Sequence, residues 1–377
     1  MAWRFEASTL QGVKQGTIEG ARSRKVGVRL NGMQTGGFLV PIDDPASDFL
    51  LTTDALIRAY DGNTLRGHGR VVSAEEVGQA NDQGGASGSV AVVFADPLWT
   101  LGKRLIGKSV AGYSMGTAGA QVDRIAIAKN VIDTVNAEGE SGVSTTLMTG
   151  TVSNTYVGPW WYKPSSEALL ELCAALDGYD FIMQPIEYSG GKYAQMNAQA
   201  VIGGNAQHAA FEFGTGRHNV KSYRRPVTLD GALNRGYNLP PGFPDNATQA
   251  VVGGTSADGT ADDASIAARG ILEGVVPGDL IVDALRLKLV QQNVRIRRNP
   301  RQIVTFEPIS QIGGSSDILP VYGTDYSVGD IVPFRAKINV SGAVVTRIDA
   351  LMRVFAVDWN IDDEGNAQPS ITVTSDI

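Results

Sequence analysis

Alternating apolar and polar residues recur near both ends of the chain and bracket one strongly marked helix pattern in the middle. In one such run, Val26, Val28 and Leu30 alternate with basic or small residues, which is the two-residue period of a strand with one buried face. Gly and Asp separate the runs at both ends, as turn residues do. We therefore predict a β-rich α+β protein, in which two small β-barrel domains of tail-tube type bracket an α/β insert domain.

The composition fits a folded chain with many turns. Of 377 residues, 43% are hydrophobic and 19% are charged, which is enough apolar volume for packed cores. The 45 glycines lie mostly outside helical patterns, so they indicate turns between strands. Residues 90–95 form one of the longest apolar stretches and are too short to span a bilayer, and the N-terminus lacks a secretory signal. We expect a soluble protein made in a cytoplasm, without stable membrane insertion.

The charge and the rare residue types exclude several kinds of site. A net charge of −7 argues against a protein-wide basic surface for nucleic acid. The single cysteine, Cys173, excludes an internal disulfide and a cysteine-based zinc site, and we expect an inert core thiol. The three histidines, His68, His208 and His218, are scattered and form no ligand pair.

Successive strands fill the N-terminal part, and we predict a first β-barrel domain over residues 1–100. Asn31 and Gly32 form a tight turn, and a strand over residues 38–42 ends near Pro41. The remaining expected elements are a hairpin with strands at residues 54–60 and 65–72, a polar loop at residues 78–88 and a strand at residues 89–94.

Helix signals mark residues 101–209, which we predict to form the α/β insert domain. Asp96 and Pro97 open a short helix that carries three leucines on one face. The leucines are Leu98, Leu101 and Leu105. Two further helices are predicted over residues 121–136 and 166–177, the latter stopped by Gly178. Residues 139–150 are expected to be loop, and the predicted strands cover residues 151–161, 179–188 and 194–202.

The rest of the chain returns to strand patterns after one irregular stretch. Residues 210–240 are predicted as strands that return to the first barrel, and residues 291–377 as the second β-barrel domain. Between them, residues 241–290 are predicted as a loop and helical linker, with a Gly/Ala/Asp loop at residues 248–263 and helices at residues 265–270 and 279–293. A strand entry at residues 328–332 and a turn at residues 362–365 mark the second barrel.

One motif suggests an enzyme. Residues 112–116, from Gly112 to Gly116, match the G-x-S-x-G nucleophile elbow, so a serine hydrolase that uses Ser114 is an alternative function. The elbow requires a buried strand directly before it, whereas Gly107 and Ser109 interrupt that run. We interpret the motif as a flexible Gly/Ser linker.

Other polar clusters are better explained as turns or solvated ends. Residues 214–219 resemble a phosphate loop, but no helix opens after them. The acidic clusters at residues 258–263 and 358–364 lack the calcium-loop spacing. The basic run at residues 295–301 either meets an acidic or phosphate partner or caps a helix end, the interpretation we favour. We assign no catalytic, cofactor-binding or metal-ligating residue, and no cofactor.

Three adjacent aromatic residues, Trp160, Trp161 and Tyr162, form the last notable cluster. Such a cluster is used either as a platform for sugar rings or, more often, as buried packing at a domain junction. A carbohydrate-binding tail component is therefore the other alternative function.

The order of these segments resembles the baseplate hub, or tail-tip hub, family of long-tailed bacteriophages and related injection machines. The resemblance covers nearly the whole chain in order, although each motif alone is unspecific. The segments that carry it are residues 23–32 and the following Phe38-Leu39-Val40-Pro41, residues 65–72, 96–105 and 165–180, residues 211–214 with Gly216, Asn219 and Val220, residues 325–332, and Arg353-Val354.

The resemblance implies a structural, non-enzymatic protein of the virion tail tip. Such hubs are homotrimers whose paired barrels form a pseudo-six-fold ring, which joins the six-fold tail tube to the three-fold tip and surrounds the DNA exit channel. The implied partners are the distal tail protein ring, the tape-measure protein and the tip or fibre proteins of the same siphovirus-like virion. With a net charge of −7, we expect DNA to pass through the lumen without specific binding.

Overall fold

The computed structural model describes residues 3–52, 54–80, 86–117, 120–155, 157–174, 178–206, 209–214, 218–226, 232–237, 265–275, 290–291, 293–294, 297, 302–309 and 319–375. Strands dominate it, as the sequence predicts. The chain divides into two compact units. The larger unit comprises Met1–Tyr223 and Thr305–Val373, and the smaller comprises Arg224–Val304 and Thr374–Ile377.

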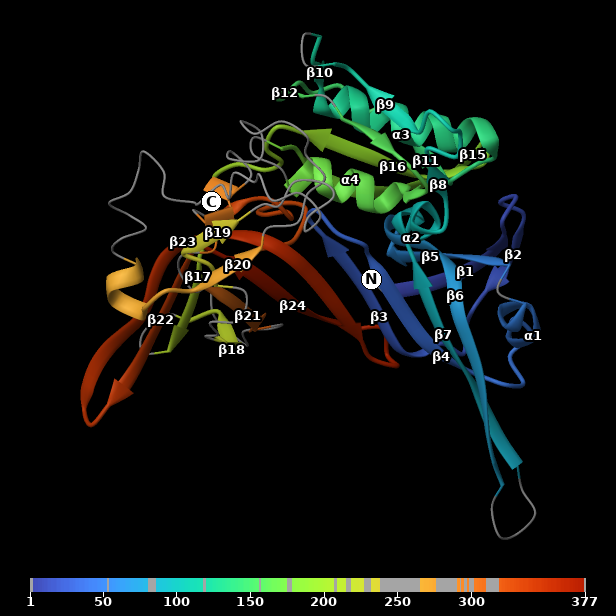
Figure 1. Cartoon of the computed structure of the whole chain (residues 1–377). Coiled ribbons are helices and arrows are strands. Elements are labelled where there is room, and N and C mark those ends of the chain that lie inside the picture. The colour runs from blue at the N-terminus through green and yellow to red at the C-terminus, as the bar shows by residue number, and fades with distance from the viewer. Residues whose placement is uncertain are drawn as a thin grey trace. The chain divides into compact units, whose positions relative to one another are not determined.

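One large sheet organises the larger unit (Figure 1). Among the described residues it contains 13 strands, with a main path in the order β18-β21-β24-β23-β3-β4-β7-β6-β5-β1-β2, while β17 pairs with β22 and β22 with β23. Its strands are β1 (Trp3–Thr9), β2 (Lys14–Thr17), β3 (Arg22–Arg29), β4 (Thr35–Pro41), β5 (Ala55–Asp61), β6 (Thr64–Ala80), β7 (Ala86–Ala95), β17 (Phe211–Gly214), β18 (Val220–Arg224), β21 (Ile303–Pro308), β22 (Ile331–Val340), β23 (Ala343–Ile361) and β24 (Ala367–Thr374).

The N-terminal and C-terminal strands meet in this sheet through β3 and β23. The two strands pair antiparallel over six residues, from Ala356 opposite Arg29 to Ile361 opposite Arg24. Segments more than 300 positions apart in sequence are therefore hydrogen-bonded neighbours. The domain boundaries predicted from the sequence, and the arrangement as two closed barrels, stay predictions.

Regular alternation builds the core beneath the N-terminal strands. Val26, Val28 and Leu30 are buried, whereas the basic residues between them are exposed, which confirms the predicted phase of β3. Phe5, Phe38 and Phe94 then meet from three strands, with ring centroids 5.4 to 6.4 Å apart. The expected hairpin between β5 and β6 and the strand ending at Pro41 are also present.

The predicted polar loop over residues 78–88 is wrong at both ends. Strand β6 extends to Ala80 and β7 begins at Ala86, with Gly78 directly opposite Gly88, and residues 81–85 lie outside the described residues. Neither glycine adopts a left-handed φ, and the ladder of backbone hydrogen bonds overrides the low strand propensity of glycine and polar residues. The result is a long two-stranded hairpin. Helix α1 (Ser47–Leu51) is a further element that the sequence pattern does not reveal.

The middle of the chain forms the α/β part of the larger unit (Figure 1). Helices α3 and α4 pack with the three-stranded sheet β11-β16-β15 around a core that includes Ile125, Val131, Leu169 and Phe181. The elements are α2 (Pro97–Gly102), β8 (Leu105–Ile106), β9 (Tyr113–Met115), β10 (Val122–Asp123), α3 (Arg124–Glu138), β11 (Val143–Ser144), β12 (Asn154–Thr155), β13 (Val157–Trp160), β14 (Lys163–Pro164), α4 (Ser165–Ala174), β15 (Asp180–Ser189) and β16 (Lys192–Gln199).

Capping side chains explain where the helices begin. Asp96 accepts a hydrogen bond from the N–H of Leu98, so α2 begins as predicted, although Leu105 belongs to β8 rather than to the helix. Asp123 accepts from two N–H groups of the first turn of α3, which places the start three residues later than the predicted residue 121. The end of the third predicted helix, residues 175–177, lies outside the described residues.

The smaller unit contains short elements. Strands β19 (Arg235–Tyr237) and β20 (Glu273–Val275) pair in parallel, residues 265–269 are helical as predicted, and Leu233, Val290 and Val294 pack together. The predicted loop at residues 248–263 and most of the predicted helix at residues 279–293 lie outside the described residues. Among the described helices, none has the length and apolar character needed to cross a membrane.

Candidate assembly surfaces

A first apolar surface lies on the solvent side of β4, β6 and β7. Leu39, Val77 and Val93 occupy the strand positions that face away from the buried phenylalanines, and they are 38%, 43% and 44% exposed. Ile42 adjoins them with 41% exposure. A shallow hollow of about 570 Å³ is lined by Leu39, Ile42 and Val77. We call these four residues the first face.

A second apolar surface lies on the hairpin of β22 and β23. Leu351 and Phe355 are 57% and 38% exposed, and they lie on the side of β23 opposite to the buried Met352 and Val354. We call Leu351 and Phe355 the second face. Apolar side chains on both phases of one strand are the sequence signal that could have revealed this face, since a half-buried strand needs only one apolar phase.

The tip of the same hairpin is also apolar. Val340 and Val344 are 41% and 55% exposed, and residues 338–346 contain no charged residue. Ser341 and Gly342 turn the chain with φ of +53° and +86°, as a tight hairpin turn requires. Below the tip, Arg335 bonds Asp349 at 3.0 Å and Glu212 at 3.4 Å, so charged groups border the second face.

A buried polar joint connects three parts of the larger unit. The Asp180 carboxylate, at the start of β15, accepts hydrogen bonds from the Asn31 side chain at 2.8 Å and the Ile202 N–H at 3.0 Å, and it pairs with Arg353 of β23. Arg353 also donates to the Gly329 and Ile202 carbonyls, and Asn31 accepts from the Phe181 N–H. The joint thus connects the β3–β4 turn, the α/β part and the C-terminal strands.

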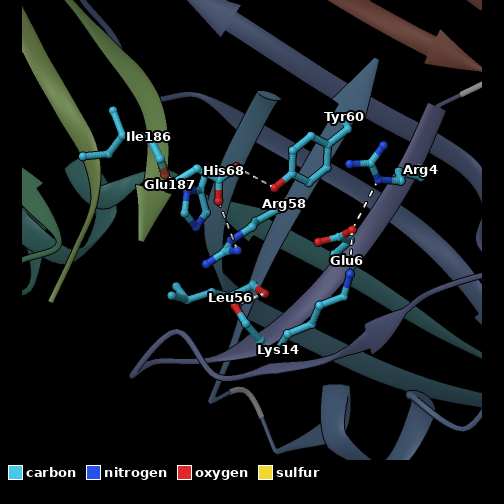
Figure 2. Close-up of polar contacts among 10 residues, drawn as sticks. Arg4, Glu6, Lys14, Leu56, Arg58, Tyr60, His68, Ile186 and Glu187 are labelled. Carbon is cyan, nitrogen blue, oxygen red and sulfur yellow. Dashed lines mark hydrogen bonds and ion pairs between the residues drawn. The ribbon is translucent and has the colours of Figure 1, made fainter. Parts of the chain in front are cut away.

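A second polar cluster connects strand β5 to β15 (Figure 2). The Tyr60 hydroxyl donates to Glu187 at 2.9 Å, and Arg58 approaches the same carboxylate at 3.4 Å. On the neighbouring strand β1, Glu6 pairs with Lys14 at 2.9 Å and Arg4 at 3.3 Å. Burial by itself raises the pKa of Glu6, but the bonds to Lys14 and Arg4 outweigh it, so the pKa lies below its usual value.

His68 occupies the buried side of this cluster. Its Nδ1 lies 3.2 Å from the Ile186 carbonyl oxygen, its ring packs against Tyr193, and Nε2 has no hydrogen-bond partner among the described residues. Burial, and then the nearby Arg58 charge, lower the pKa of His68 to about 3. The neutral ring therefore serves packing between the N-terminal strands and β15, which the scattered histidines of the sequence did not reveal.

The serine motif does not form a nucleophile elbow. Residues 113–115 form β9, which pairs with β13, so Ser114 lies exposed on a short strand rather than on a strand-to-helix turn. The expected Gly/Ser linker is equally wrong, because pairing with β13 orders the segment. His218 is exposed, and His208 lies outside the described residues.

The aromatic cluster splits into a buried and an exposed part. Trp160 is 7% exposed and stacks on Tyr113 with centroids 5.8 Å apart, which confirms the packing interpretation for this residue. Trp161 and Tyr162 are 55% and 63% exposed, and the Trp161 indole donates to the Val110 carbonyl at 3.3 Å. Trp161 and Tyr162 thus give the insert a small aromatic surface.

The remaining sequence motifs either belong to structural elements or lie outside the described residues. Cys173 packs partly against the core, and burial raises its pKa to about 12, as expected of an inert thiol. Residues 362–365 form the predicted turn, whereas Asp358 belongs to β23. Strand β17 ends at Gly214 and β18 begins at Val220, and residues 215–217 of the predicted turn lie outside the described residues. The described residues contain no cluster suited to a metal, and residues 258–263 and all of the basic run at residues 295–301 except Arg297 lie outside them.

The fold is similar to those of phage tail proteins of known structure. The 43 kDa tail protein of prophage MuSo2 from Shewanella oneidensis has a TM-score of 0.55 and 11% identity over 98% of this chain and 98% of that chain. The tail protein from Neisseria meningitidis MC58 has a TM-score of 0.54 and 9% identity over 100% and 97% of the two chains. No protein-family model and no curated protein matches the chain. The predicted resemblance to phage tail proteins is confirmed at the level of the fold.

Proposed function

We propose that the chain is a non-enzymatic structural hub of a phage tail tip. Three copies form a ring that joins the six-fold tail tube to the three-fold tip and surrounds the DNA exit channel. The observation that carries the proposal is the presence of two separate apolar sheet faces on one chain whose fold matches phage tail proteins over its whole length. Exposed apolar side chains that gather on one sheet face mark sites of protein–protein contact.

The two faces suit a closed ring. A ring of identical subunits needs a head-to-tail contact, in which one surface of a subunit meets a different surface of the next. The first face on β4, β6 and β7 and the second face on β23 supply two such surfaces, and both belong to the larger unit. In this proposal the two strand-rich ends form the two barrels, with the predicted boundaries at residues 100, 209, 240 and 290.

The proposed partners follow from the position in the tail. The distal tail protein ring lies on one side of the hub, tip or fibre proteins lie on the other, and the tape-measure protein passes through the lumen. DNA leaves through the same channel without specific binding, and a net charge of −7 supports this because an acidic wall repels phosphates.

The experiment that tests the hub is oligomer analysis of the purified chain at increasing concentration, by mass photometry and electron microscopy. We expect a three-fold ring with a central hole for the unaltered chain. Leu351→Glu places a charge in the second face and should leave monomers, whereas the control Val110→Glu, at a fully exposed position of the insert, should still form rings. Monomers at all concentrations, or rings that persist in Leu351→Glu, would contradict the proposal.

A carbohydrate-binding tail component is the second candidate, because Trp161 and Tyr162 are exposed side by side on the insert. Exposed aromatic faces are the usual platforms for sugar rings. Glycan-array binding that disappears in Trp161→Ala, with Trp99→Ala as the control outside this surface, would support this candidate. An array without signal would remove it.

A further inference from the structure

A pocket of about 1060 Å³ opens in the larger unit beside the pairing of β3 with β23. Aromatic rings form much of its wall: Trp3 and Trp359 lie 5.8 Å apart, and Tyr322 meets Trp359 edge-on at 5.0 Å. Such rings offer apolar surface to a ligand without much loss of side-chain entropy on binding. The polar groups of the pocket decide which ligand it suits.

The central polar group of the pocket is Arg24. It projects from the core-facing side of β3, the side that also carries the buried Val26 and Val28, and it is only 8% exposed. Nη1 donates to the Trp3 carbonyl at 3.2 Å and Nη2 to the Asp362 carbonyl, while Nε has no hydrogen-bond partner within the described part of the chain. Among the described residues no carboxylate lies within 4.0 Å of this guanidinium. A buried cation normally has such a partner, because desolvation is costly without one.

The local backbone also departs from regular strand geometry. Ser23, which lines the pocket next to Arg24, has a φ of +49°, and the pairing of β3 with β4 shifts register between Arg22 and Lys25. A non-glycine residue in the left-handed region costs free energy and is concentrated at binding sites. The irregularity therefore coincides with the residue whose charge is uncompensated.

The carboxylates that line the pocket are already engaged. Asp61 lies 3.7 Å from Arg66, which in turn stacks over Tyr322 at 5.4 Å. Asp362 accepts hydrogen bonds from the backbone and side chain of Asn366 within its own turn. Together with Lys25, the lining carries three cations and two carboxylates, so it is locally positive in a chain of net charge −7.

We infer that this pocket binds a carboxylate, and that the carboxylate is an acidic side chain of a neighbouring chain in the assembly. The guanidinium of Arg24 supplies charge-assisted hydrogen bonds to the carboxylate, Lys25 and Arg66 add positive charge at the rim, and the aromatic wall contacts the apolar residues beside the acidic one. The inference rests on the proposed function only in that the ligand comes from another chain.

Tryptophan fluorescence of the full chain tests the inference directly, because Trp3 and Trp359 line the pocket. The probe is a synthetic ten-residue peptide with a central Glu flanked by Leu and Tyr, titrated at low salt, and its matched control carries Gln in place of the Glu. We expect a saturable spectral change with the Glu peptide and at least tenfold weaker binding by the Gln peptide, the usual effect of losing a hydrogen bond to a charged group.

Variants assign the binding to the pocket. Arg24→Gln should weaken binding of the Glu peptide roughly tenfold or more, and Arg66→Gln should weaken it less. Arg22→Gln, an exposed position of the same strand outside the pocket, should leave it unchanged. Arg66→Gln alone decides the matter if Arg24→Gln does not fold. No saturable change, or equal affinity for the Glu and Gln peptides, would overturn the inference.

Two further measurements distinguish the acidic peptide from other ligands, and distinguish this inference from the hub proposal. Free succinate is titrated at the same concentrations as the Glu peptide. Saturable binding of succinate that depends on Arg24 would assign the pocket to a small carboxylate, and the inference that the carboxylate belongs to a neighbouring chain would be overturned. If inorganic phosphate competes with the Glu peptide more strongly than succinate does, the inference that the ligand is a carboxylate is overturned. Ring formation is scored separately on the same samples, so a chain that forms rings but ignores the peptide contradicts this inference alone.

Discussion

At the scale of single residues, the ion pair of Asp180 and Arg353 connects three parts of the larger unit, a role that no sequence motif predicted. Both side chains are largely buried, with 11% and 16% exposure, and each makes further hydrogen bonds to groups from distant segments. Both residues lie in segments that carry the family resemblance, but no local pattern predicts that they pair, because the contact forms only when the two strands meet.

The first prediction concerns this pair. Asp180→Ala should lower the free energy of unfolding by about 3–5 kcal/mol, because it leaves the buried Arg353 charge without a carboxylate. The control is Arg335→Met, which removes an exposed ion pair with Asp349 and should leave the free energy of unfolding nearly unchanged, because solvent screens an exposed pair. Urea denaturation followed by circular dichroism gives both values. Equal losses of unfolding free energy in the two variants would show that burial of the joint does not determine its contribution to stability.

The second prediction concerns His68 and pH. Its pKa is about 3 in the folded chain and 6.5 in the unfolded chain, so the unfolded state binds more protons between these values. The stabilisation by neutral His68 is therefore present above pH 6.5 and is lost as the pH falls towards 3, by at most about 1.4 kcal/mol per pH unit.

Unfolding measured from pH 7 to pH 4 tests this dependence. Other acids also titrate in this range, so the informative quantity is the difference between variants. His68→Gln should flatten the decline in stability, and His218→Gln, at an exposed position, is the comparison variant. A decline of the same steepness in His68→Gln would refute the assignment.

At the scale of elements, local signals placed some boundaries well and others poorly. The Asp96–Pro97 pair predicted the start of α2, and the side chain does bond the Leu98 N–H at 2.9 Å. Residues 78–88 misled the same reasoning, because glycine-rich polar sequence favours a loop while the cross-strand ladder of β6 and β7 decides otherwise. Capping acts within three residues, whereas strand pairing depends on a partner elsewhere in the chain.

The third prediction concerns the cap of α2. Asp96→Ala should destabilise the chain by about 1–2 kcal/mol or somewhat more, because Asp96 also accepts a hydrogen bond from the buried N–H of Gln34 at 2.9 Å. Asp48→Ala in the first turn of α1 provides the comparison, since Asp48 is exposed and does not cap that helix; its effect should be a few tenths of a kcal/mol. Thermal and urea unfolding of both variants would measure the difference.

At the scale of the whole molecule, the head-to-tail geometry of the proposed ring gives the fourth prediction. Leu39→Glu disables the first face and Leu351→Glu the second, so each variant alone should remain monomeric. In a mixture, the intact second face of Leu39→Glu binds the intact first face of Leu351→Glu. No further subunit can add, because the remaining face of each variant is disabled. We therefore expect dimers containing one copy of each variant, and no rings.

Native mass spectrometry distinguishes the outcomes, because one variant can carry a mass tag. Homodimers of either variant would indicate that each face binds a second copy of itself, which does not close a ring of three. Monomers in the mixture would show that the two faces do not meet, and the first and second faces would then belong to other partners of the tail.

Local sequence correctly predicted the strand-rich character, the phase of β3 and the Asp96 cap of α2, because these depend on residues close together in the chain, and the order of segments along the chain predicted the likeness to phage tail proteins at the level of the fold. The three-dimensional structure is needed to show that β3 pairs with β23, that Asp180 pairs with Arg353, and that Arg24 lines a pocket with no carboxylate within 4.0 Å of its guanidinium among the described residues. It also decided which apolar residues stay exposed on β7 and β23. These features depend on contacts between segments up to 300 or more positions apart, and no local propensity specifies such contacts.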